Sequence, residues 1–341
     1  MRIIPGLQVV RVSETTLRIG GGGDGLWISG LTTADQDFIA SLASPEPGPA
    51  ETTHPTPEAN GAPALDARRR DQLLEVLAPV LEEPFRLPGA LGATLAPDVT
   101  AYSTAYSTPA GQLVRNRSRA TARIWGLGRC GQSIAALLAA SGIGALCLHD
   151  DLPVQAGDIG AGPLRIADLG KNRTIAVAHR IGQQWPRTRL ARWEPTADDT
   201  GVGAQVSIVT ACDSLPDRLA DHLAATRVPH LPVLFGPSWA HIGPLVIPGL
   251  TTCLDCARAA TTHRGNVPRA TGCPRSGSST AELALSGTAA GLATLQVMML
   301  LDGINVPTTA DAVLMVDLST GGVHRLPVEP RPGCTCMIPA A

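Results

Sequence analysis

Short apolar runs alternate with amphipathic stretches along the chain from residue 120 to residue 235. The apolar runs predict strands at 122–126, 145–149, 187–192, 206–211 and 231–235. Between them, apolar residues recur at helical spacing over 132–140, 173–184 and 215–225. Strands that alternate with helices are typical of a parallel sheet with crossover helices. We therefore predict an α/β fold with a mostly parallel sheet and helices on both faces.

The first 85 residues have a different pattern, in which three short alternating runs precede two amphipathic stretches. The alternating runs at 7–12, 16–19 and 26–28 predict a small antiparallel sheet. The amphipathic stretches predict helices through Phe38 and over 65–81. We interpret residues 1–85 as a winged-helix-like α+β segment. Its Pro-, Thr- and Glu-rich stretch, 44–64, is expected to be a linker. Residues 86–119 are expected to connect this segment to the α/β domain, 120–341.

Charge and composition exclude several classes of protein. The net charge of −2 gives no overall positive field, so we expect neither nucleic acid nor an anionic membrane as a partner. The first residues lack the pattern of a secretory signal, and we expect a cytoplasmic protein. The uncharged segment 283–301 is long enough to span a bilayer, but its glycine, serine, threonine and glutamine residues favour a buried helix.

The eight cysteines include two closely spaced pairs, Cys253 with Cys256 and Cys334 with Cys336. In a reducing compartment such pairs more often hold metal than form disulfides, and thiolate is a preferred zinc ligand. Four thiolates complete a closed tetrahedron, so we predict a structural zinc ion that fixes the C-terminal tail to the domain. Free thiols or disulfides are the alternatives, and His263 and His324 are the histidines that could replace a ligand.

A glycine-rich turn, with glycines at positions Gly126, Gly128 and Gly131, follows the first predicted strand of the α/β domain and precedes a helix. Such a turn allows phosphate to approach the N–H groups at the start of a helix. Asp150 ends the next strand, where a carboxylate accepts the ribose hydroxyls of a bound nucleotide. The pattern predicts a Rossmann-like nucleotide site. It fits an ATP site and a nicotinamide dehydrogenase equally, and a plain strand-to-helix turn is the third interpretation.

Five segments, the glycine turn among them, distinguish these alternatives. They are the strand and turn at 124–131, the helix and strand at 137–150, the run Ile208-Val-Thr-Ala-Cys-Asp-Ser-Leu-Pro-Asp-Arg218, and Pro248-Gly-Leu-Thr-Thr-Cys-Leu-Asp-Cys256 with the apolar helix that follows at 286–301. Together they resemble the ubiquitin-activating-enzyme-like superfamily, the ThiF and MoeB type of adenylyltransferase, over residues 120–302. A dehydrogenase gives no reason for the paired cysteines.

The resemblance implies an ATP-dependent enzyme that adenylates the C-terminal carboxylate of a peptide or small protein. It implies that ATP binds at the glycine turn with its ribose on Asp150, and that Asp213 holds magnesium. Arg218 is expected to contact phosphate or substrate. The lysine that contacts ATP in the family is matched by Lys171 or Arg173, of which Arg173 lies closer in the alignment. Homodimers are also typical of this family.

Besides the lysine position matched by Lys171 or Arg173, the chain departs from the family pattern at two places. The run 155–162 contains no arginine where the family has a phosphate-binding one, and Arg129 stands in the turn where a small residue is usual. Cys273 matches a loop thiol of related enzymes, so it is either a nucleophile or a loop cysteine without a role. These departures bear on catalysis more than on the fold.

The segments 4–10, 16–20 and 31–42 resemble the PqqD-like clamp of ThiF-like proteins in azole peptide maturation, which holds a leader peptide as an added strand. The alternative is a small domain that only covers the α/β core. Two functions follow from the resemblance. The protein is either an adenylating enzyme, or a catalytically degenerate scaffold that presents a precursor peptide to a separate modifying enzyme.

Overall fold

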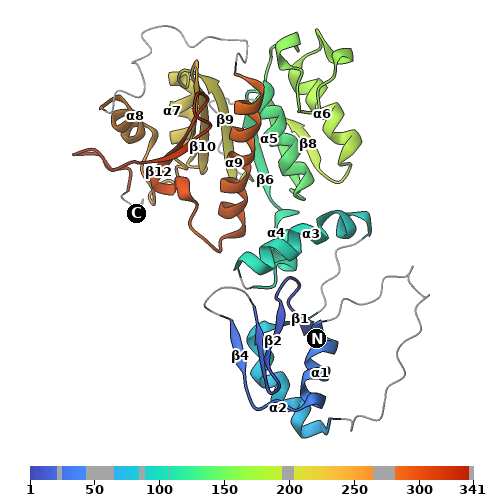
Figure 1. The fold of residues 1–341 in the computed structure, drawn as a ribbon. Coiled ribbons are helices and arrows are strands. Elements are labelled where there is room, and N and C mark those ends of the chain that lie inside the picture. Colours follow the sequence, from blue (N-terminus) through green and yellow to red (C-terminus); the bar gives the residue numbers. More distant parts are fainter. Residues whose placement is uncertain are drawn as a thin grey trace. The chain divides into compact units, whose positions relative to one another are not determined.

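The computed structural model describes residues 1–20, 25–43, 65–83, 89–106, 108–193, 203–263 and 281–337 (Figure 1). The chain divides into two compact units, 1–115 and 116–341. The predicted linker at 44–64 lies outside the described residues. The predicted connection at 86–119 contains two helices, α3 (Gly89–Tyr106) and α4 (Gly111–Arg117).

The first unit contains the small antiparallel sheet that the sequence predicts. Its strands run in the order β2 (Val9–Ser13), β3 (Thr16–Ile19) and β4 (Leu26–Ile28). A second ladder pairs β1 (Arg2–Ile3) with β5 (Leu81–Glu82). Helices α1 (Thr33–Ala43) and α2 (Ala67–Leu77) supply Ile39, Leu73 and Leu77 to a core shared with the strands.

A capping box fixes the start of α1, and an ion pair joins α1 to α2. The Thr32 N–H donates to the carboxylate of Asp35, and the Asp35 N–H donates back to the Thr32 hydroxyl (2.8 and 3.2 Å), which fixes the start of α1. The guanidinium of Arg69, on α2, donates to both oxygens of Asp35 at 3.1 and 2.9 Å. Asp35 is 1% exposed, so its charge is compensated inside the unit.

The second unit is built on an eight-stranded sheet. Its parallel part contains β6 (Thr121–Trp125), β7 (Ala145–His149), β8 (Arg189–Arg192), β9 (Val206–Cys212) and β10 (His230–Phe235). These strands lie in the order β8-β7-β6-β9-β10, which is the order 3-2-1-4-5 of a Rossmann sheet. Antiparallel strands β11 (Trp239–Ile242), β12 (Ala312–Asp317) and β13 (Val323–Pro327) extend it beyond β10.

Helices cover both faces of this sheet, as predicted. Ile208 and Val233 belong to the core under α5 (Arg129–Ala140) and α9 (Leu283–Asp302), which pack side by side (Figure 1). Their chain neighbours Val209 and Leu234 belong to a separate core under α7 (Asp217–Thr226). Since successive strand residues point to opposite faces, α7 covers the other side of the sheet. Helix α6 (Arg173–Gln184) follows β7, and α8 (Leu254–His263) begins directly after Cys253 and contains Cys256.

Helix α9 is long and apolar enough to cross a membrane by length and composition. In the structure, half of its most apolar window is buried. Ala289, Ala293 and Val297 are fully buried within the core that α9 shares with α5. Its apolar character is therefore explained by its central position in the second unit.

Candidate functional site

The glycine turn lies where the strand order of the sheet reverses, between β6 and β9. In open α/β sheets this is the place where ligands bind. Gly126 has a φ of +83°, a conformation that favours glycine. Its carbonyl accepts a hydrogen bond from the Thr210 hydroxyl (2.9 Å), which ties the turn to β9. A side chain at Gly131 would collide with the Gly126 carbonyl, so this close helix–turn packing requires glycine. Helix α5 begins just after Gly128, without a side-chain cap.

Asp150 directly follows β7, and its carboxylate contacts the glycine turn. Its Oδ2 accepts the backbone N–H of Leu127 (2.7 Å), a residue of the turn itself. Its Oδ1 accepts the N–H of Leu152 (3.0 Å). The residue is 7% exposed, so the carboxylate that was expected to bind ribose is largely enclosed by the protein.

Arg173 begins helix α6 and is held by two carboxylates. Its Nε and Nη2 donate to the two oxygens of Asp158, at 2.8 and 2.9 Å, in a bidentate pair. Its Nη1 donates to Oδ2 of Asp150 at 3.1 Å. Arg173 is 3% exposed and Asp158 is 1% exposed. The three side chains therefore form a buried triad with one net negative charge.

Asp158 is the member of this triad that the sequence analysis missed. It lies in the run 155–162, which replaces the family's arginine-containing stretch. Its Oδ2 also accepts the N–H of Gln155 (2.8 Å), and its carbonyl accepts a hydrogen bond from Gln132 of α5 (2.9 Å). A lone acidic residue in a polar run gives no sequence signal for burial beside an arginine 15 positions later.

The other residues expected to contact the nucleotide lie outside the triad. Asp213 follows β9 at the same edge of the sheet as the turn, with a left-handed φ of +61° and its N–H donating to the Phe235 carbonyl (2.8 Å). Arg218 is exposed in the first turn of α7. The ammonium group of Lys171 donates to Asp168 (3.0 Å). Cys273 lies outside the described residues.

The contacts of the residues around the glycine turn limit how many donors remain for a nucleoside triphosphate. Phosphate groups require cations and N–H donors to neutralise their charge. Arg173 is engaged by two carboxylates, the Leu127 N–H by Asp150, and the Nη1 of Arg129 by the Ala281 carbonyl (3.1 Å). In the arrangement seen here, Arg173 and the Leu127 N–H are therefore engaged within the protein, whereas the start of α5 has no side-chain cap.

The two cysteine pairs come together, as predicted. Cys253 and Cys256 lie at the start of α8, and Cys334 and Cys336 lie in the C-terminal tail. All four sulfurs lie within 4.8 Å of one another. The sulfur of Cys253 is 3.7 Å from that of Cys256 and 3.8 Å from that of Cys334, and those of Cys256 and Cys336 are 4.0 Å apart. Thiolates about 2.3 Å from a tetrahedral zinc ion lie about 3.8 Å from one another. The cluster could therefore hold a metal ion.

A backbone N–H and burial complete the surroundings of this cluster. The Arg331 N–H donates to the sulfur of Cys256 at 3.3 Å, a contact that favours a thiolate. Burial raises the pKa of the Cys256 thiol to about 12, because its charged form loses solvation. A bound cation would reverse this effect, since a coordinating thiol is deprotonated.

Comparison with known proteins places this geometry in a family. The model of the ThiF family matches residues 108–336. No curated protein matches the chain. Among solved structures, Escherichia coli MccB with MccA-N7isoASN is similar at 17% identity and a TM-score of 0.66, covering 98% of this chain and 99% of that one. E. coli MccB with ATP (16%, TM-score 0.65) covers 98% of each chain. PaaA (16%, TM-score 0.70) covers 95% of this chain and 98% of its own.

Proposed function

This chain belongs to the ThiF family, and we propose that it binds a peptide or small protein without adenylating it. The observation that carries the proposal is the buried triad of Asp150, Arg173 and Asp158. In this function the protein presents its bound peptide to a separate modifying enzyme.

The solved relatives support a peptide as the partner. Two of the similar MccB structures hold the peptide MccA or a form of it, and they match 98% of this chain, a share that extends into the first unit. In that unit β2 and β4 are the outer strands of the three-stranded sheet. An outer strand has backbone groups that can pair with an added peptide strand. We therefore assign peptide binding to the first unit.

The triad explains why adenylation is not part of the proposal. Arg173 stands at the position that resembles the family's ATP-contacting lysine, but it could reach phosphate only by leaving Asp158. Removing one partner of a buried ion pair costs about 3 to 5 kcal/mol, because the other charge is left uncompensated. A phosphate ligand would also meet the net negative charge of the triad. The arginine is therefore used to hold the 155–158 segment against the glycine turn.

Adenylation of the partner's C-terminal carboxylate remains the second candidate function. It is favoured by the glycine turn at the reversal of strand order, by the position of Asp213 at the same edge, and by the similar MccB structure with ATP. In that function Asp213 would hold magnesium, and the exposed Arg218 would contact phosphate or substrate.

We also propose that the cysteine cluster holds a structural zinc ion. Four thiolates leave no open position for water or substrate, which is typical of structural sites. The ion would join the start of α8 to the C-terminal tail, and would thereby fix β13, which directly precedes the tail.

The decisive experiment compares the wild type with Asp158→Asn, which removes one negative charge and frees Arg173 from its bidentate pair. We expect no ATP–pyrophosphate exchange from the wild type with any member of a library of short synthetic peptides, although some of these peptides should bind at micromolar concentration. We expect Asp158→Asn to bind Mg-ATP at least ten times more tightly in calorimetric titration. The control Asp255→Asn alters an exposed acid of α8 and should leave ATP binding unchanged.

Two results would contradict the proposal in different ways. Pyrophosphate exchange by the wild type would show that the triad opens during turnover and that the protein is an adenylating enzyme. Equal ATP affinities of the wild type and Asp158→Asn would show that the triad does not limit nucleotide binding.

A further inference from the structure

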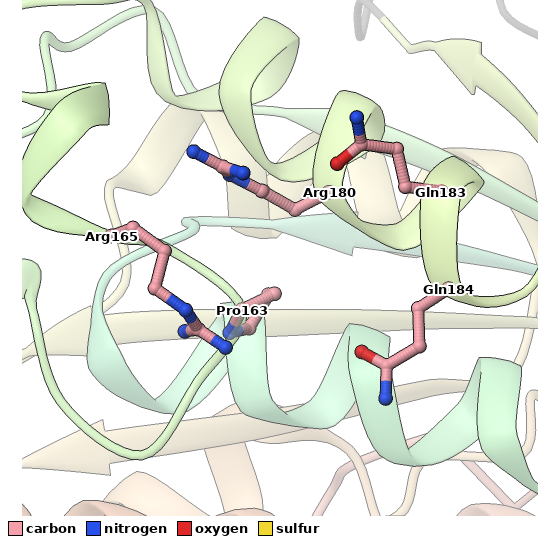
Figure 2. A pocket seen from close by; sticks show the side chains of 5 residues that line it. All are labelled: Pro163, Arg165, Arg180, Gln183 and Gln184. Carbon is pink, nitrogen blue, oxygen red and sulfur yellow. The ribbon is translucent and has the colours of Figure 1, made fainter.

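A pocket of about 270 Å³ lies on the surface of the second unit, between α6 and the loop that precedes it (Figure 2). Its lining residues are Pro163, Arg165, Arg180, Gln183 and Gln184. None of the five carries a negative charge, and four have side chains that donate hydrogen bonds. Figure 2 shows the two guanidinium groups and the two carboxamide groups around the same space.

Both arginines of the pocket are positioned by contacts within the protein. Nε and Nη2 of Arg180 donate to Asp168, at 2.8 and 3.0 Å, and Asp168 is 1% exposed. Nη1 of Arg165 donates to the carbonyls of Gly162 and Leu164, at 2.7 and 3.0 Å. Nη1 of Arg180, and Nε and Nη2 of Arg165, make no hydrogen bond to another described residue. The donors that face the pocket are therefore held in place before a ligand arrives.

The stretch of chain that lines the pocket has more basic than acidic residues, although the chain as a whole has a net charge of −2. Two of its basic residues pair with acids of the preceding segment, Arg173 with Asp150 and Asp158, and Arg192 with Asp151. Between residues 159 and 193 the one acidic residue is Asp168. The same stretch contains seven basic residues, Arg165, Lys171, Arg173, Arg180, Arg187, Arg189 and Arg192. Asp168 also accepts a hydrogen bond from Lys171. Arg165, Arg180, Lys171 and Asp168 together carry a net charge of +2.

We propose that this pocket binds phosphate, either as the free ion or as the phosphate group of a small monoester. Guanidinium groups bind the oxygens of such dianions through paired hydrogen bonds, and the two carboxamides add further donors. The volume lies just below the usual range for drug-sized ligands, which fits a ligand of few atoms.

The pocket is separate from the glycine turn. Its α6 residues follow Arg173 by 7 to 11 positions, which is roughly 10 to 16 Å along the helix axis. The proposal therefore does not depend on whether the glycine turn binds a nucleotide.

Calorimetric titration at low salt tests this pocket, with orthophosphate in one series and glycerol 3-phosphate in the other. We expect the wild type to bind at least one of them at submillimolar concentration, and the tighter ligand identifies the source of the phosphate group. Arg165→Gln should weaken binding at least tenfold, because it removes an exposed cation that is bonded only to carbonyl oxygens and thus leaves the fold intact. The control Arg187→Gln removes an exposed cation of the same stretch that does not line the pocket, and should change affinity less than twofold.

A second variant, Gln183→Glu, places a carboxylate in the pocket without removing an arginine. We expect it to abolish phosphate binding, whereas Ile175→Glu, which adds the same charge to another exposed position of α6, should retain most of the affinity. Equal losses in the pocket and control variants would overturn the proposal, because they would indicate diffuse attraction to a basic surface. The proposal would also be overturned if neither ligand bound at 10 mM. This concentration is about ten times the weakest expected dissociation constant.

Discussion

Asp150, Arg173 and Asp158 illustrate how the role of a residue depends on its neighbours. An arginine at position 173 is compatible with phosphate binding when only the sequence is considered. In the structure its donors are directed to two buried carboxylates, and the aspartate expected to bind ribose receives two backbone N–H groups. The side chains at this edge of the sheet therefore satisfy one another, which favours a stable turn over a charged ligand.

Asp35 gives a prediction about pH at the same scale. Hydrogen bonds from Arg69 are the main reason that the pKa of Asp35 is lowered to about 2. A carboxyl whose pKa is lower in the folded state stabilises the fold above its unfolded pKa, and this contribution is lost as the pH falls towards the folded value. We expect Asp35→Asn to lower the free energy of unfolding by on the order of 1 kcal/mol at pH 6.

The difference between wild type and Asp35→Asn should shrink as the pH falls from about 4 to about 2. Urea unfolding of both proteins across this range measures it. The control Asp37→Asn changes a neighbouring, exposed acid of α1 that forms no ion pair with another described residue, and should show no comparable pH dependence. A constant difference between wild type and Asp35→Asn would contradict an ionised Asp35 in the folded state.

At the scale of elements, periodicity predicted most of the second unit. The strands and helices from β6 to β10 have the strong apolar patterns that burial on a sheet requires, and their predicted bounds agree with the structure within a few residues. The cysteine cluster was also predictable, because the chemistry of paired thiols does not depend on the details of packing. The triad was not predictable, since ion pairing among buried side chains depends on positions in space.

Helix α3 is one of the elements that the sequence pattern did not predict; α4, α8 and strands β11 to β13 are others. The residues of α3 are rich in glycine and alanine and include Pro97, so the stretch was expected to be a turn-rich connection. The repeated Ala-Tyr-Ser-Thr places Tyr102 and Tyr106 four residues apart, and their rings stack at 5.7 Å. Residues four apart lie on one face of a helix, so the repeat places the two tyrosines in contact within α3.

The cysteine cluster gives a prediction for α8 and the tail. We expect the purified protein to contain one equivalent of zinc by elemental analysis, and Cys334→Ser to contain much less. The variant should also unfold at a temperature several degrees lower, because it loses the contact between α8 and the tail. Cys147→Ser changes a cysteine of β7 outside the cluster and should retain its zinc. Full zinc occupancy in Cys334→Ser would exclude this residue as a ligand.

At the scale of the whole molecule, the sheet order 3-2-1-4-5 brings distant parts of the second unit together. The ion pair between Arg117 and Asp302 closes this arrangement, because it joins the beginning of the unit to the end of α9. Nε of Arg117 donates to Oδ1 of Asp302 at 2.8 Å, and each side chain is 1% exposed. The ThiF family model matches residues 108–336, a range that contains every strand of this sheet.

This pair gives a prediction about stability. Arg117→Met leaves the Asp302 carboxylate buried without its guanidinium, and should lower the free energy of unfolding by about 3 to 5 kcal/mol. Adding Asp302→Leu to Arg117→Met should restore most of the lost free energy of unfolding, because a buried apolar pair has no charge to compensate. Denaturant unfolding of the single and double variants measures both effects. Arg325→Met breaks an exposed pair with Asp311 and should cost about 0 to 1 kcal/mol. A double variant no more stable than Arg117→Met would contradict the mechanism.

A metal ion held by the cysteine cluster would also constrain the unfolded chain. Cys253 and Cys334 are 81 positions apart, so a shared metal ion closes a long loop that contains α9. Such closure lowers the entropy of the unfolded state. By analogy with a disulfide of this loop length, it would raise the free energy of that state by about 4 kcal/mol. Removal of the metal therefore affects the most apolar helix of the protein as well as the tail. We expect metal depletion to increase the transient opening of α9, and the first visible consequence to be aggregation.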